Sequence, residues 1–129
     1  MKKTLFLVCL AALLLLTAGV AFPGSRSDDP LGIAVSPQTL ILNWDQGGHV
    51  AVHTDIPYGA VDLESLELSG VPVWWTKADD RGCLVAFFHE AEVKSIVSPP
   101  SATLTLTGWW VDGEEFAGSD TVTVMYSKR

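Results

Sequence analysis

Catalytic sequence motifs are absent from this 129-residue chain. It has no Gly-x-Ser-x-Gly elbow to expose a nucleophilic serine, and no Gly-x-Gly-x-x-Gly loop to cradle a phosphate group. Glycoside hydrolysis needs two carboxylates on either side of a cleft, and a domain of this size has little room for a deep cleft. We therefore expect that the protein is not an enzyme.

Cysteine is scarce, with two residues in the whole chain. Cys9 lies in the amino-terminal apolar run and would be removed with it, so that Cys83 alone remains and no internal disulfide can form. Cys83 lies in the apolar segment CLVAFF, where a cysteine is expected to be buried as a small hydrophobic residue. Ordinary core packing must then stabilise the fold.

Basic residues are also few. The chain has 8 Lys and Arg against 15 Asp and Glu, which gives a formal net charge of −7 at pH 7. An acidic surface repels the phosphates of nucleic acids and anionic lipid headgroups. Nucleic acid is therefore not expected as a partner, whereas a cation or a neutral ligand is compatible with the charge.

The amino-terminal residues have the pattern of a secretory signal. Two lysines precede an apolar run, and small residues occupy the −3 and −1 positions of a cleavage site after Ala21. We expect residues 1–21 to be a signal peptide and the protein to be secreted, to the periplasm or outside the cell, with no membrane insertion after cleavage. The alternative is an uncleaved anchor, because residues 5–22 approach the length of a membrane span.

Short β-type segments and turn signals fill the rest of the chain. Residues 22–31 are polar and bounded by prolines, so they are expected to form a flexible tether before a single domain over residues 32–127. The spacing of the segments predicts an all-β antiparallel sandwich of seven or eight short strands, with one short helix near residues 90–97. The expected strands cover residues 33–35, 39–44, 49–55, 65–70, 71–77, 83–89, 102–111 and 115–126.

The segment LTGWWVDGEEFAGSD, residues 106–120, predicts a hairpin. Even-numbered residues are apolar on both of its strands, so a two-residue Asp-Gly turn would send the two apolar sets to opposite faces. An odd-length turn with Gly113 in a left-handed conformation, or a bulge, keeps them on one face. We therefore predict that Trp110 points inward and Trp109 outward, and that only one indole of this pair can bind a ligand.

The segments SLELSGVPV, LVAFFHEAEV and the hairpin LTLTG…DGxxFxGSDTVxV resemble an immunoglobulin-like module that recurs in secreted and surface proteins of bacteria. The resemblance covers residues 33–126, and its motifs are structural. It implies an immunoglobulin-like β-sandwich and a location outside the cytoplasm. In such modules the loop before the LVAFF-type strand often carries a longer Asp-rich calcium segment, whereas here this loop is only KADDRG.

Candidate metal ligands are sparse. His49 and His53 share one face of an expected strand but stand about 13 Å apart, too far for one metal ion. They are expected to face solvent. Asp79 and Asp80 could ligate calcium, but they lack the usual alternating Asp scaffold. We expect no cofactor, with calcium at these two aspartates as the alternative.

Exposed apolar side chains are the remaining functional signal. Alternation in VPVWWTK places Trp75 inward and Trp74 outward, and in CLVAFFH it places Phe87 inward. Leu84 and Phe88 then lie on the second face of their strand, which needs a cover. The cover is either the helix near residues 90–97 or a partner. The candidate binding surface consists of Trp74, Leu84, Phe88 and Trp109.

Two functions fit these observations. The first is a secreted, non-catalytic β-sandwich module for adhesion, protein binding or a structural role at the bacterial envelope. The alternative is a small carbohydrate-binding module that stacks sugars on Trp109 or Trp74. A flat indole beside polar groups favours a sugar, whereas a continuous apolar patch favours a protein.

Overall fold

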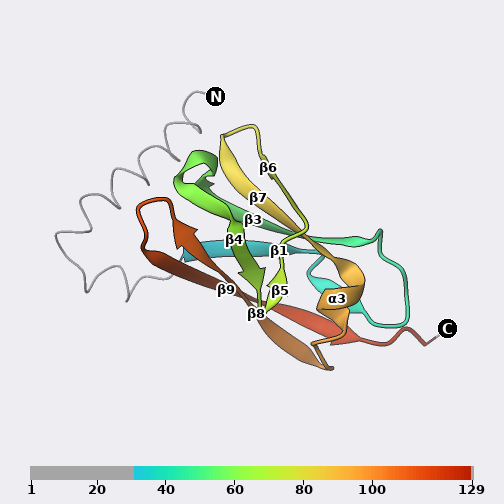
Figure 1. Ribbon diagram of the computed structural model, residues 1–129. Coiled ribbons are helices and arrows are strands. Elements are labelled where there is room, and N and C mark those ends of the chain that lie inside the picture. The colour runs from blue at the N-terminus through green and yellow to red at the C-terminus, as the bar shows by residue number, and fades with distance from the viewer. Residues whose placement is uncertain (1–30, 129) are drawn as a thin grey trace.

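The computed structural model describes residues 31–128, and in this range the protein is all-β, as predicted (Figure 1). The expected signal peptide and nearly all of the expected tether lie outside the described residues. The strands are β1 (Leu31–Ser36), β2 (Thr39–Ile41), β3 (His49–Pro57), β4 (Val61–Leu68), β5 (Val71–Pro72), β6 (Trp75–Ala78), β7 (Cys83–His89), β8 (Ser101–Trp110) and β9 (Glu115–Met125). A short 3-10 turn, η1 (Tyr58–Ala60), precedes β4, and a short helix, α3 (Glu90–Lys94), follows β7.

The strands form one curled sheet in the order β5-β4-β8-β9-β1-β3-β7-β6, with β2 beside β9. β1 joins the two halves of this sheet. Its first residues pair in parallel with β9, with Leu31 opposite Gly118, and its later residues pair antiparallel with β3, from Ile33 opposite Thr54 onward. One strand therefore connects the two halves into a single sheet.

The core lies on the concave side of the curl, where alternate residues of both halves meet. Val50 and Val52 of β3 and Leu104 and Leu106 of β8 are buried, and so is Val122 of β9. Their neighbours along each strand are polar or partly exposed. This period-two pattern is the one that the sequence predicts, and each fully buried side chain of this size contributes about 1.5–3 kcal/mol to folding.

The β8–β9 hairpin has the predicted odd-length turn. Trp109 pairs with Glu115, and the N–H of Trp110 donates to the carbonyl of Glu114, so that three residues form the turn. Gly113 has a φ of +97° and donates to the carbonyl of Trp110. The positive φ favours glycine, and the turn keeps the apolar sides of both strands on one face, as expected.

Several elements differ from the predictions. Within residues 31–128 there are nine strands rather than seven or eight, β2 ends at Ile41 rather than at residue 44, and β4 covers Val61–Leu68 rather than 65–70. The strands form one curled sheet, and β1 and β2 pair in parallel with β9, so the prediction of purely antiparallel pairing was wrong.

The expected strand over residues 71–77 is two strands, because the chain crosses from β5 in one half of the sheet to β6 in the other. Alternation restarts at this crossing, so Trp75 is 53 % exposed and the prediction that it points inward was wrong. The predicted helix over 90–97 is confirmed only over Glu90–Lys94; Val93 is buried, but Ile96 is 47 % exposed.

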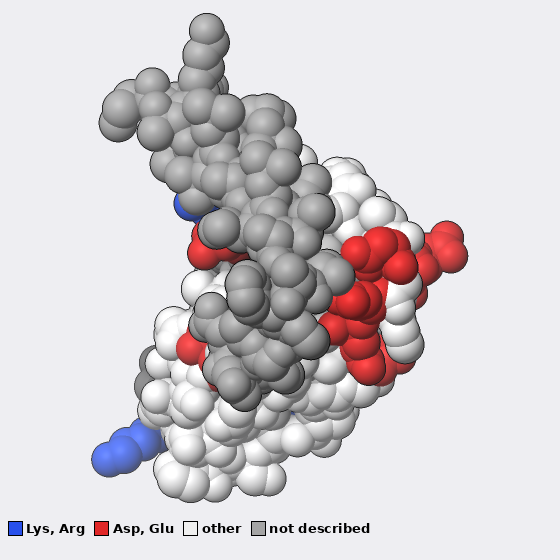
Figure 2. Space-filling model, turned by 90° about the vertical axis from the view of Figure 1, so that its left-hand side faces the viewer, with Lys and Arg blue, Asp and Glu red and all other residues white. Residues whose placement is uncertain are grey.

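Charge is unevenly distributed on the surface. On the face drawn in Figure 2, acidic side chains gather along one side, and few basic side chains are visible. Within residues 31–128, no helix has both the length and the apolar character needed to cross a membrane.

Candidate functional site

The structure separates the four residues of the predicted binding surface. Trp74 is 46 % exposed and Trp109 is 45 % exposed, so both indoles point outward as expected. Trp74 lies just before β6 and Trp109 near the end of β8, in different halves of the sheet. Leu84 and Phe88 are fully buried, so the structure removes them from the surface.

The face assignment of β7 was reversed in the sequence-based prediction. Phe88 lies opposite Val50 of β3, and both side chains belong to the buried core together with Leu84. Phe87 points the other way and is only partly buried. Because β7 is apolar on both faces, alternation within it could not identify the inner face, and its cross-strand partners decided it.

Five aromatic side chains meet on the outer face of β3, β7 and β6, and we call them the aromatic patch. The imidazole of His49 stacks on the indole of Trp74, with ring centroids 4.5 Å apart and planes 14° apart. The imidazole of His89 lies 4.9 Å from the same indole. The ring centroids of Trp75 and Phe87 lie 5.2 Å apart. The imidazole of His49 also packs edge-on against the Phe87 ring, with the centroids 6.3 Å apart. For a pair of Phe, Tyr or Trp rings, such as Trp75 and Phe87, the contact contributes roughly 0.5–1.5 kcal/mol beyond its buried area.

Strand register assembles the aromatic patch. His49 of β3 lies directly opposite His89 of β7, and Trp75 of β6 lies opposite Phe87. The N–H of Trp74 donates to the carbonyl of Phe87 at 2.8 Å, which fixes the backbone before β6. The patch therefore joins three separate segments, and the only sequence signal for it was the pair of tryptophans.

The side chain of Lys77 borders the aromatic patch. The ammonium group of Lys77 lies 5.8 Å from the centroid of the Phe87 ring, within the range of a cation–π contact. His49 and His53 are exposed, as predicted. Within residues 31–128, no group of three His, Cys, Asp or Glu side chains is arranged to hold a metal ion.

Asp79 stabilises the β6–β7 turn. Its carboxylate accepts hydrogen bonds from the N–H groups of Arg81 at 2.8 Å and Cys83 at 3.0 Å, and it forms an ion pair with the Arg81 side chain at 3.4 Å. Burial opposes ionisation of Asp79, but the hydrogen bonds from Cys83 and Arg81 and the charge of Arg81 outweigh it and lower its pKa. Asp79 thus has protein partners in this turn, and the neighbouring Asp80 is exposed.

Cys83 begins β7 and is 2 % exposed, so its predicted burial is confirmed. The structure contains no free cysteine among the residues that it describes. The sulfur therefore offers no accessible thiol for a surface reaction.

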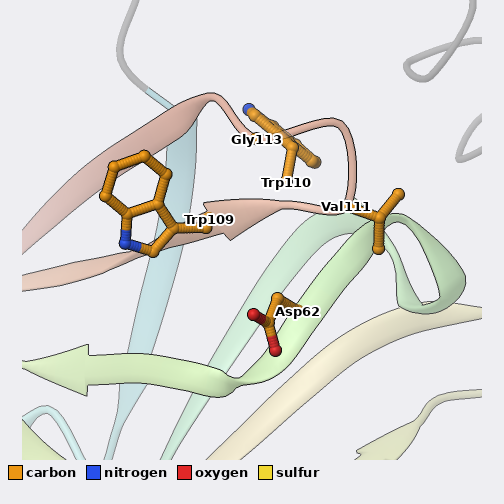
Figure 3. Close-up of a pocket in the computed structure, with 5 residues that line it drawn as sticks. All are labelled: Asp62, Trp109, Trp110, Val111 and Gly113. Carbon is orange, nitrogen blue, oxygen red and sulfur yellow. The ribbon is translucent and has the colours of Figure 1, made fainter.

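Trp109 stands in a different environment from the aromatic patch. It lines a shallow pocket of about 480 Å³ together with Asp62, Val111 and Gly113 (Figure 3). Trp109 and Asp62 project from neighbouring strands and lie opposite one another in the ladder of β4 and β8. Its indole is therefore flanked by a carboxylate rather than by other aromatic rings.

Trp110 also lines this pocket but points into the core, as predicted. It is 5 % exposed and packs on Phe116, with ring centroids 4.8 Å apart. Its indole Nε1 is buried and has no hydrogen-bond partner.

Comparisons with known proteins add no relatives. No protein-family model matches the chain, and no curated protein or solved structure is significantly similar to it.

Proposed function

We propose that this protein is a secreted, non-catalytic module with an immunoglobulin-like β-sandwich fold, which binds a protein partner at the bacterial envelope through the aromatic patch. Adhesion and a structural role in the envelope are both forms of this function. The exposure of two adjacent tryptophans, Trp74 and Trp75, is the single observation that carries the proposal.

Strand order supports the immunoglobulin-like assignment. The half β1-β3-β7-β6 follows the order A-B-E-D of that fold, and the half β5-β4-β8-β9 follows the order C′-C-F-G. β2 pairs in parallel with β9. It therefore occupies the place of a second segment of strand A, next to strand G. The segments that resemble a bacterial immunoglobulin-like module fall on β4 to β5, β7 to α3, and β8 to β9.

The composition of the aromatic patch favours a protein partner. Tryptophan is enriched in the energetically dominant centres of protein interfaces, and charged residues are depleted there. Trp74 and Trp75 are about half exposed, and their ring centroids lie 6.4 Å apart. The two indoles therefore form one continuous aromatic surface. Two large indoles remain in contact with water in the isolated protein. A partner that buried them would gain hydrophobic free energy on binding.

Variants of the aromatic patch test this function. Purified wild-type protein, the double variant Trp74→Ser/Trp75→Ser and the control Trp109→Ser are immobilised and exposed to envelope proteins of the source cell. We expect one protein to be enriched by the wild type and the control but lost from the double variant, and direct titration of that protein should give the same order. Equal enrichment by all three would contradict the role of the patch.

Carbohydrate binding at Trp109 is the second candidate. The observation that favours it is an outward-facing indole beside the carboxylate of Asp62. Sugar rings combine an apolar face, which can stack on an indole, with hydroxyl donors, which a carboxylate can accept. A glycan array probed with the wild type and with Trp109→Ala tests it. Binding that persists in Trp109→Ala would exclude this indole as the platform.

Processing of the amino terminus tests secretion. Because small residues precede the site after Ala21, the exported protein is expected to begin at Phe22. Amino-terminal sequencing of protein from the culture medium and the periplasm checks this expectation. Membrane-bound protein that still begins at Met1 would support the uncleaved anchor instead.

A further inference from the structure

A groove of about 950 Å³ lies between residues 42–48, α3 and the segment after β9. It is at the end of the molecule opposite the β8–β9 turn (Figure 1). Besides His89, two aromatic side chains line the groove and are largely exposed: Trp44 at 62 % and Tyr126 at 60 %. Neither belongs to the aromatic patch, although His89 borders both places.

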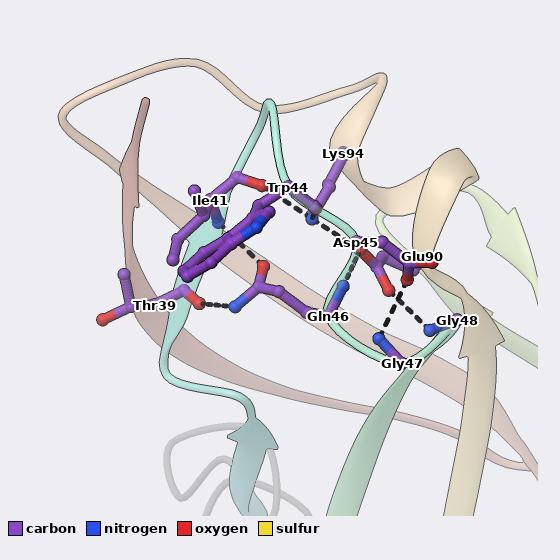
Figure 4. Close-up of polar contacts among 9 residues, drawn as sticks. All are labelled: Thr39, Ile41, Trp44, Asp45, Gln46, Gly47, Gly48, Glu90 and Lys94. Carbon is purple, nitrogen blue, oxygen red and sulfur yellow. Dashed lines mark hydrogen bonds and ion pairs between the residues drawn. The ribbon is translucent and has the colours of Figure 1, made fainter. Parts of the chain in front are cut away.

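A buried ion pair fixes the loop that carries Trp44 (Figure 4). Glu90 is 6 % exposed, and its carboxylate accepts the N–H of Gln46 at 2.8 Å and the N–H of Gly48 at 2.6 Å. Lys94 donates to the same carboxylate at 2.5 Å and to the carbonyls of Ile41 at 2.7 Å and Trp44 at 2.6 Å. These bonds hold the backbone on both sides of the Trp44 side chain.

The segment that carries Tyr126 is tied to the same loop. The side-chain amide of Asn43 donates to the carbonyl of Ser127 at 3.1 Å, and its oxygen accepts the N–H of Ser127 at 2.8 Å. The side chains of Trp44 and Tyr126 are therefore both attached to a backbone that is fixed before any ligand arrives. Such preorganisation reduces the ordering cost of binding.

The charges of the groove restrict its ligand. Among residues 31–128, Lys94 is the only Lys or Arg that lines the groove, and its three N–H donors are all used by Glu90 and the two carbonyls. No ammonium or guanidinium group among these lining residues is left to pair with an anion, whereas the carboxylates of Asp45 and Glu92 face the groove as acceptors. A carboxylated or sulfated ligand would be repelled, and a neutral ligand rich in hydroxyl donors would not.

We propose that this groove binds a neutral oligosaccharide, with Trp44 and Tyr126 as stacking platforms and Asp45 and Glu92 as acceptors for sugar hydroxyls. The volume suits a short sugar chain, and the mixture of aromatic faces with a few polar groups is typical of small-molecule sites. This binding is independent of protein recognition by the aromatic patch, since the two places present different tryptophans.

Calorimetric titration of the purified full chain tests the groove. The probes are cellohexaose, xylohexaose and mannohexaose, with hexagalacturonate as the anionic counterpart. We expect saturable binding of at least one neutral probe and none of hexagalacturonate. Trp44→Ala and Tyr126→Ala should each weaken that binding by roughly tenfold or more. Trp75→Ala should leave it unchanged, because the Trp75 ring contacts Trp74 and Phe87, which do not line the groove.

Three results would overturn the groove as the sugar site. They are the absence of binding by every neutral probe, equally tight binding of hexagalacturonate, and binding that Trp44→Ala and Tyr126→Ala leave intact. Loss in Trp109→Ala alone would assign the sugar to that indole instead. Thermal melting of each variant identifies unfolding. Trp44 and Tyr126 both lie outside the core, so if one alanine variant does not fold, the other provides the decisive measurement. Failure of the groove leaves the protein-capture experiment on Trp74 and Trp75 unaffected.

Discussion

Trp109 and Trp110 are neighbours in sequence, but they have opposite environments. The pleat of β8 sends one indole to solvent and the other into the core, where it packs on Phe116. The unpartnered Nε1 of Trp110 makes its burial less favourable than its area suggests, because a buried donor without a partner costs about 1–3 kcal/mol. Trp110 therefore stabilises the fold through the packing of its ring and not through a hydrogen bond.

Substitution of these two tryptophans should have unequal effects on stability. Trp110→Ala is expected to lower the free energy of unfolding by about 3–5 kcal/mol, because it leaves a cavity in the core. Trp109→Ala should cost roughly 1 kcal/mol or less. Trp110→Phe should cost far less than Trp110→Ala, since it removes the unpaired N–H and keeps an aromatic ring. Urea unfolding measures all three, and equal losses in the two alanine variants would contradict the face assignment.

The side chain of Glu90 bonds to residues outside its own helix. It holds Gln46 and Gly48, and with Lys94 it closes the loop over residues 42–48. Removal of one member of a buried ion pair leaves the other charge without its partner, which costs more than the pair itself contributes.

Glu90→Gln should therefore destabilise the protein by about 3 kcal/mol. Glu92→Gln is the matched control, because Glu92 lies in the same helix but is exposed. Urea unfolding gives the stability of both variants, and hydrogen exchange at Gln46 and Gly48 should rise only in Glu90→Gln. Unchanged exchange at these two amides would show that the loop does not depend on the Glu90 carboxylate.

β1 links the two halves of the sheet, because it pairs with β9 in one half and with β3 in the other. Its parallel contact with β9 depends on a close backbone approach at Gly118. A Cβ atom at this position would lie 2.6 Å from the carbonyl oxygen of Leu31, which a strand cannot accommodate without moving. Asp120 strengthens the same region by accepting the N–H of Val35 and the side-chain amide of Gln38.

Gly118→Ala should displace the start of β1 and cost roughly 1–3 kcal/mol. Gly32→Ala is the control, because a Cβ atom there meets nothing within 4 Å. Hydrogen exchange of the amides of β1, together with urea unfolding, measures the effect. Loss of protection in the Gly32→Ala variant instead would show that the close approach at Gly118 is not what limits β1.

Acid stability is a property of the whole molecule. Hydrogen bonding from Val35 lowers the pKa of Asp120, and it outweighs the opposing effect of burial. For Glu90, burial raises the pKa, but the hydrogen bonds from Lys94, Gln46 and Gly48 outweigh burial and lower it. With Asp79, three carboxylates in different elements are therefore easier to ionise in the folded than in the unfolded protein.

Lowered pKa values predict the direction of the pH dependence. Each of these groups stabilises the fold above the unfolded carboxyl pKa of about 4, and this contribution is lost as the pH falls through the lower folded pKa. The urea midpoint should therefore fall steeply below about pH 4. Asp120→Asn should be less stable than the wild type at neutral pH and should lose less on acidification. A parallel decline in the two proteins would contradict the role of Asp120.

Local sequence determined the positions of most strands, the odd-length turn at Gly113, and the opposite directions of Trp109 and Trp110. These follow from period-two alternation and from turn chemistry within a few residues. Alternation was ambiguous in β7, which is apolar on both faces, and only the pairing of Phe88 with Val50 decided that Phe88 and Leu84 are buried.

Tertiary structure decided which residues meet in the aromatic patch and in the groove. The aromatic patch depends on the register of three strands, and the chain crossing between β5 and β6 turned Trp75 outward against its local pattern. In the groove, Glu90 reaches a partner 44 residues away, and Asn43 reaches one 84 residues away. Contacts over such separations leave no periodic trace in the sequence, because they depend on how strands pair and cross rather than on which residues are adjacent.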